Sequence, residues 1–283
     1  MTGATITDFT DPGCPFAFSA EPIRLRLAWI YGEQIDWRTR MVGLAESPAT
    51  YEDSGFTVER LSKSLAHLSS EYHMPMDTSL RPRMAATLPA CRAVVAARLH
   101  APEHEHALLR RLRVRTFSGE LLDAPETIAA AALDAGIDPA ELAGWVASSE
   151  VADALAQDMD LARHPRPAGL ALDRKLAGWS GGRRYTCPSY EIAGPNGAEP
   201  IVIPGFWPFP VYEVAIANLL PDAERRDPPE SVEEVLGWAG TPLATQEVAA
   251  ICELDFNPAR EALGRVAVEQ HVGWDGFWSL AST

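Results

Sequence analysis

Apolar and polar residues along the first forty positions follow two different periods. Residues 4–9 form a short apolar-rich run that ends at an Asp-Pro-Gly turn, which indicates a strand. Residues 15–31 carry apolar side chains at spacings of three and four, which indicates a helix that Pro22 is expected to kink. Residues 35–41 alternate apolar with polar, as a half-buried strand does. The chain is therefore predicted to begin with a strand–helix–strand unit.

The middle of the chain changes to a helical period. Residues 56–176 carry helical patterns and no strand pattern. Strand patterns return at 184–192 and 200–203, joined by a Gly-Pro-Asn-Gly turn, which predicts a hairpin. A further helix is expected over 210–220.

A polar Arg-Arg-Asp-Pro-Pro-Glu stretch at 225–230 separates the end of the chain from the predicted elements before it. Beyond it lie three short helical patterns, at 231–238, 245–252 and 257–269, and a candidate hairpin at 271–280. This outline is like a helix-turn-helix. Residues 230–283 nevertheless hold two arginines against nine acidic residues, so phosphate anchors for DNA are missing and a packing or dimerisation module is expected.

The order of these elements predicts the fold class. A strand–helix–strand unit, a helical block and a strand–strand–helix unit form an α/β thioredoxin-like fold with a large helical insertion. We expect residues 1–55 and 180–226 to form the thioredoxin-like domain and residues 56–179 the insertion subdomain. Residues 230–283 would form a small α-helical C-terminal module.

Composition narrows the functional classes. The 283 residues are 47% hydrophobic and 22% charged, which is typical of a globular protein, and the net charge of −15 argues against nucleic acid as a partner. No apolar run is long enough to span a membrane, and the first ten residues do not resemble a signal peptide. We therefore expect a cytoplasmic protein whose cysteines are reduced.

Cys14 is the first candidate for chemistry. It follows the first predicted strand and immediately precedes the first helix, where free backbone N–H groups and the helix dipole favour a thiolate. Its position is equally compatible with a small buried apolar residue.

A second cysteine stands before a proline in the predicted strand at 184–192. Pro188 cannot donate to a strand ladder, so it marks either an edge position or the cis-proline that faces the helix start in a thioredoxin fold. In the second case Cys187 would lie opposite Cys14. The residues expected to bind substrate around this pair are Pro15, Phe16, Tyr185, Thr186 and Pro188.

The stretch Asp-Pro-Gly-Cys-Pro-Phe-Ala-Phe at 11–18, followed by Glu-Pro at 21–22, resembles the active-site turn of the DsbA-like thioredoxin family. The sequence Leu-Pro-Ala-Cys-Arg-Ala at 88–93 resembles the helical insertion of its cytosolic FrnE-type branch. The resemblance ends near residue 220. It implies a cytosolic thiol–disulfide oxidoreductase in which Cys14 is the nucleophile. The family usually carries Cys-x-x-Cys, but Ala17 replaces the second cysteine here, so a dithiol cycle within the turn is not available.

Three hypotheses for the cysteine pair remain open. Cys187 could resolve a mixed disulfide on Cys14. Alternatively, a small thiol such as glutathione or mycothiol could do so, as in the kappa-class transferases and 2-hydroxychromene-2-carboxylate isomerases, which would make the protein an isomerase or transferase. Thirdly, Cys14 and Cys187 could hold a soft metal such as copper(I) or zinc, or another ligand. We expect no tightly bound cofactor, a small thiol or a protein disulfide as partner, no nucleic acid or membrane, and a homodimer as one possible assembly.

Overall fold

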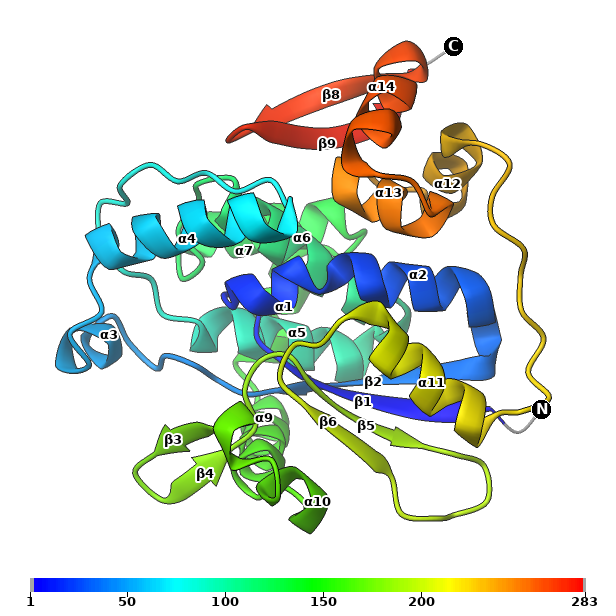
Figure 1. Ribbon diagram of the computed structural model, residues 1–283. Coiled ribbons are helices and arrows are strands. Elements are labelled where there is room, and N and C mark those ends of the chain that lie inside the picture. Colours follow the sequence, from blue (N-terminus) through cyan, green and yellow to red (C-terminus); the bar gives the residue numbers. More distant parts are fainter. Residues whose placement is uncertain (1–2, 282–283) are drawn as a thin grey trace.

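A four-stranded sheet forms the centre of the computed structural model, which describes residues 3–281 (Figure 1). Its strand order is β2-β1-β5-β6, and β1 pairs in parallel with β2 and antiparallel with β5. The four strands are β1 (Ala4–Thr10), β2 (Ile35–Met41), β5 (Ser189–Ala193) and β6 (Ile201–Pro204). This arrangement is the predicted thioredoxin-like sheet.

The helix expected over 15–31 is present as two helices. α1 (Pro15–Ser19) and α2 (Glu21–Tyr31) are separated at Ala20, and each has a proline in its first turn, where a missing N–H does not break a hydrogen bond. The break lies two residues before Pro22. Together with the short 3-10 turn η1 (Gly32–Gln34), these helices provide the crossover that the parallel pair β1–β2 requires.

The strand predicted over 184–192 is shorter than expected. Pro188 lies outside the ladder, which starts only at Ser189, because proline has no N–H to donate. Of the residues before it, Arg184 belongs to a separate hairpin, formed by β3 (Ala177–Trp179) and β4 (Gly182–Arg184), and residues 185–187 lie in no strand. The insertion predicted over 56–179 therefore ends in a strand.

Helices make up most of the insertion between β2 and β3. They surround a core of their own, centred on the buried face of α5. The helices are α3 (Ala49–Asp53), α4 (Val58–Tyr72), α5 (Leu88–His100), α6 (Glu105–Phe117), α7 (Pro125–Asp134), α8 (Pro139–Val146), α9 (Ser149–Arg163) and α10 (Pro167–Leu170), with 3-10 turns η2 (Pro102–His104) and η3 (Asp173–Lys175). No helix in residues 3–281 is long and apolar enough to cross a membrane.

The C-terminal module contains the three predicted helices and also a small sheet, so its description as α-helical was incomplete. The helix expected over 257–269 ends at Val266, and the next residues pair with the final strand instead of continuing the helix. The elements are α12 (Val232–Ala239), β7 (Leu243–Ala244), α13 (Thr245–Cys252), α14 (Phe256–Val266), β8 (Ala267–Val272) and β9 (Asp275–Leu280), and the strand order is β7-β9-β8.

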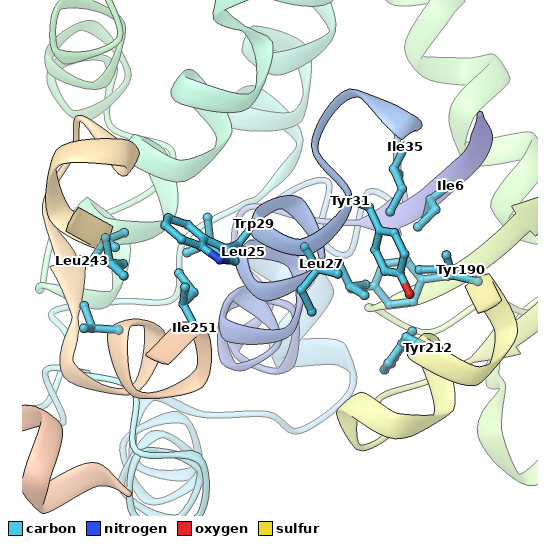
Figure 2. Close-up of a cluster of buried hydrophobic side chains, with 14 of the residues drawn as sticks. Ile6, Leu25, Leu27, Trp29, Tyr31, Ile35, Tyr190, Tyr212, Leu243 and Ile251 are labelled. Atoms are coloured by element: carbon cyan, nitrogen blue, oxygen red, sulfur yellow. The ribbon is translucent and has the colours of Figure 1, made fainter. Parts of the chain in front are cut away.

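The C-terminal module shares a hydrophobic core with the thioredoxin-like domain. In Figure 2, Leu25 and Trp29 of α2 face Leu243 and Ile251 of the module. On the other side of α2, the same cluster continues through Leu27 and Tyr31 to the sheet and to α11 (Phe209–Leu219). The module is therefore packed on the helix that follows the candidate site.

Candidate active site

Cys14 stands at the junction between the sheet and the first helix, as the sequence predicted. It caps α1 with an extended backbone, and only 5% of the residue is exposed. Its Sγ donates a hydrogen bond to the carbonyl oxygen of Cys187, at 3.3 Å. The peptide bond from Cys187 to Pro188 is cis. Two cysteines that are 173 residues apart thus meet across one cleft.

The environment separates the acidities of the two thiols. The Cys187 thiol, as a hydrogen-bond donor, lowers the pKa of Cys14 in spite of its burial, and the N–H groups of Ala17 and Phe16 add to this effect. Neither N–H makes a regular capping hydrogen bond to the sulfur, so they act as nearby dipoles. Burial, followed by the adjacent Cys14, raises the pKa of Cys187 well above its ordinary value. Cys14 is therefore the more acidic thiol of the pair: it donates to the Cys187 carbonyl oxygen while protonated and gives up that hydrogen bond when it ionises.

The turn that carries Cys14 is held by Asp11, a residue to which the sequence analysis gave no role. One carboxylate oxygen accepts the N–H of Gly13 at 2.8 Å. The other accepts the N–H of Leu44 and the hydroxyl of Thr87, each at 2.8 Å. The only signal in the sequence was the Asp-Pro-Gly turn, in which the aspartate accepts a hydrogen bond from two residues onward.

A pocket of about 580 Å³ opens beside this turn, between the thioredoxin-like domain and the insertion. Pro15 and Phe16, both predicted to bind substrate, line it together with Gly13. The sulfur of Cys14 lies behind the turn and is not itself part of the lining. The opposite walls come from α4, from the loop before α5 and from the residues after α6, and include Leu61, Leu65, Leu68, Met84, Phe117 and Leu122. Sequence periodicity could not identify these residues because their shared wall exists only in the folded chain.

The other predicted binding residues lie on the sheet side of the cleft and do not line this pocket. Tyr185 is fully buried, and its hydroxyl donates to Glu191 at 2.8 Å. Thr186 donates to the carbonyl oxygen of Lys175 at 3.1 Å. Pro188 is buried next to Cys187. A role of these three residues in substrate binding remains a prediction.

Metal ligands are sparse around the pair. Among residues 3–281, no three histidine, cysteine, aspartate or glutamate side chains are arranged to hold a metal ion. The two sulfurs alone would be the protein's contribution to such a site.

The sheet order, the cysteine at the start of the first helix and the proline opposite it define a thioredoxin-fold protein with a helical insertion. A family model described as Thioredoxin matches residues 8–165, more than half of the chain, and the chain belongs to that family.

Curated relatives resemble the chain over nearly its whole length. The ClpXP adapter protein SpxH of Halalkalibacterium halodurans is 24% identical over 286 residues, covering 96% of this chain and 87% of that protein. SpxH of Shouchella clausii is 26% identical over 269 residues, covering 94% of this chain and 83% of that protein. Both matches are too long to leave out the C-terminal module.

Solved structures share the fold at low sequence identity. The cytosolic disulfide reductase DsbM from Pseudomonas aeruginosa has a TM-score of 0.53 and 16% identity, covering 76% of this chain and 96% of that chain. A probable DsbA oxidoreductase from Streptomyces coelicolor has a TM-score of 0.55 and 16% identity, covering 80% of this chain and 93% of that chain. These neighbours confirm the DsbA-like fold.

Proposed function

We propose that the chain is a cytoplasmic thiol–disulfide oxidoreductase in which Cys14 is the nucleophile and Cys187 resolves the mixed disulfide. The observation that carries this proposal is the contact between the two cysteines, whose pKa values are shifted in opposite directions. Two titratable groups with separated pKa values are the usual mark of divided chemical roles. The contact also supplies the resolving thiol that Ala17 cannot.

The cycle balances with a disulfide substrate. The Cys14 thiolate attacks one substrate sulfur, the substrate S–S bond breaks, and the other sulfur leaves as a thiolate that takes up a proton. Cys187 then loses its proton and attacks the Cys14 sulfur, which releases the second substrate thiol. The substrate is reduced by two electrons and the protein holds a Cys14–Cys187 disulfide. Two molecules of a small thiol such as glutathione or mycothiol reduce that disulfide and leave as the small-thiol disulfide, which completes the turnover.

Intact-mass analysis after mild oxidation tests the resolving role. We expect a loss of two hydrogen atoms that peptide mapping assigns to Cys14 and Cys187, and no such loss in the Cys187→Ser variant. A persistent small-thiol adduct on Cys14 of the wild-type protein would instead assign resolution to an external thiol. DsbM has also been solved with GSH, so glutathione is the small thiol with which this alternative can be tested. A metal that copurifies and is released by acid would contradict both thiol mechanisms.

A second candidate function is that of a protein adapter. The observation that favours it is the near full-length match to two ClpXP adapter proteins, which extends over the C-terminal module. An adapter needs binding surfaces for a client and a protease and does not need turnover at a thiol. The C-terminal module would supply part of those surfaces.

Protein half-lives in cells separate the two functions. If the chain is an adapter, its deletion lengthens the half-life of particular proteins, and the doubly substituted Cys14→Ser, Cys187→Ser chain restores the normal half-lives. Unchanged half-lives after deletion would exclude the adapter function. If only the wild-type chain restores the normal half-lives, the two cysteines are needed for the adapter function.

A further inference from the structure

The pocket beside Cys14 is lined mostly by apolar side chains, and its charged lining residues are Arg81, Arg83 and Glu120. Two of the three are neutralised within the protein. Arg83 pairs with Asp123 at 2.7 Å, and Glu120 pairs with Arg115 at 2.8 Å. Neither has a full charge to offer to a ligand.

Arg81 differs from both. Its guanidinium donates to the backbone carbonyl oxygens of Thr116, at 2.7 Å, and Glu120, at 3.2 Å, while its Nε is buried without a partner. Among the side chains that the structure describes, no carboxylate forms an ion pair with it. Asp77 acts on it only from a longer distance and raises its pKa, while burial lowers that pKa more strongly. Carbonyl oxygens orient the group but do not cancel its charge, and a half-buried charge is stabilised most by an ionised partner.

We infer that the pocket binds a ligand with an apolar body and one carboxylate, and that Arg81 pairs with this carboxylate. Its volume of about 580 Å³ suits a small organic molecule. Pro15 and Phe16 directly follow Cys14 and form one end of the pocket, so a disulfide of this class would be held beside the turn that carries Cys14, although that sulfur is not itself in the lining. This assignment of the substrate class rests on the proposed thiol function.

Glutathione is a poorer match for this pocket. It carries two carboxylates and an ammonium group, whereas the described lining contains one unpaired guanidinium and no unpaired carboxylate. Placing it in the pocket would leave at least one charge without a partner in a mainly apolar site, which costs free energy. The small thiol of the reductive step is therefore not expected to occupy this pocket.

Two aromatic disulfides provide matched probes. Both are phenyl pyridyl disulfides: one carries a single carboxylate on its phenyl ring, and the other carries no charged group. With either reagent, the Cys14 thiolate attacks one sulfur, a Cys14–aryl disulfide forms, and one coloured aryl thiolate leaves. The rate of colour release that depends on Cys14 is obtained by subtracting the rate of the Cys14→Ser variant.

The test compares the full-length wild-type chain with Arg81→Gln and Arg83→Gln. We expect Arg81→Gln to slow the reaction with the carboxylated reagent roughly tenfold, and to change the reaction with the neutral reagent less than about twofold. Arg83→Gln removes the same charge from the same pocket but from a paired residue, so both rates should stay within about twofold. Arg81→Lys keeps a point charge and should retain part of the preference for the carboxylated reagent over the neutral one.

Each other outcome overturns the inference in an identifiable way. Equal slowing by Arg81→Gln and Arg83→Gln would mean that only the overall charge matters. Complete loss of selectivity in Arg81→Lys, with unchanged melting temperature, would mean that the shape of Arg81 matters rather than its charge. If Cys14 reacts with both reagents and Arg81 has no effect, the substrate class is wrong and the thiol function stands. If Cys14 reacts with neither, the proposed function fails as well.

Discussion

At the scale of single residues, the unequal thiols of Cys14 and Cys187 determine the chemistry. Only the Cys14 sulfur has its pKa lowered, whereas burial raises the pKa of Cys91 well above its ordinary value and that of Cys252 to about 11. A thiolate is the reactive form of cysteine. The order of reactivity should therefore follow these shifts.

Alkylation tests this order directly. We expect iodoacetamide to modify Cys14 below the ordinary thiol pKa of about 8.5, and before Cys91 and Cys252. Peptide mass spectrometry of samples alkylated briefly at successive pH values measures this. Simultaneous modification of all four cysteines near the ordinary thiol pKa would contradict the role of the helix terminus and of Cys187.

The contribution of Cys187 can be isolated by substitution. Cys187→Ala removes the donor that is the largest cause of the lowered pKa of Cys14, so that pKa should rise. Cys187→Ser keeps a hydroxyl donor in the same place and should preserve most of the effect. The pH dependence of Cys14 alkylation gives both values. An equal rise in the two variants would mean that the side chain acts by packing and not by hydrogen bonding.

At the scale of elements, β1 carries a buried acid beneath α2. Burial, only partly offset by Arg113, raises the pKa of Asp8 from 3.8 to about 6, and its Oδ1 has no hydrogen-bond partner. A carboxyl whose pKa is higher in the folded state opposes folding once it is ionised. Its effect is absent below the unfolded pKa and grows as the pH rises through the folded one.

Asp8→Asn should accordingly stabilise the protein at neutral pH and not in acid. We expect its free energy of unfolding to exceed that of wild type by up to about 3 kcal/mol at pH 7, and to match it near pH 4. Urea denaturation at the two pH values measures the difference. A gain that is the same at both pH values would exclude titration of Asp8 as the cause.

At the scale of the whole molecule, buried charges join three parts of the chain. Glu21 of α2 pairs with Arg113 of α6, and the neighbouring Arg110 pairs with Glu247 of α13 through two contacts, at 2.6 and 2.7 Å. Glu247 has no exposed side-chain surface. These pairs tie the insertion to the C-terminal module directly behind the candidate site.

Removing one partner of this buried pair should weaken the whole assembly. We expect Glu247→Ala to destabilise the protein by about 3–5 kcal/mol, because the buried Arg110 loses its two short contacts and keeps only the more distant Glu21, at 3.8 Å, as a charge partner. Glu253, at the end of the same helix, pairs with Arg26 but its side chain is 53% exposed, so Glu253→Ala should cost less than about 1 kcal/mol. Denaturant unfolding of both variants measures this, and equal losses would rule out the buried pair as a special link.

The sequence by itself determined the order of the elements and the candidate for the nucleophile. Apolar period and turn residues are local signals, and they located β1, β2, the hairpin of β5 and β6, and the helical insertion to within a few residues. They were less accurate at two places where tertiary contacts outweigh the local pattern. Pro188 lies outside β5, and the residues of β8, which were expected to continue the helix α14, pair with β9 instead.

Only the tertiary structure decided what surrounds the nucleophile. Asp11 holds the turn of Cys14 through Leu44 and Thr87, and Arg81 lines the pocket beside that turn, through contacts between segments that lie far apart along the chain. No periodicity records such contacts, because each depends on how the sheet, the insertion and α1 pack against one another. The cysteine before Pro188 was the one distant partner visible in advance, since a proline in a strand pattern already indicates a special position in the fold.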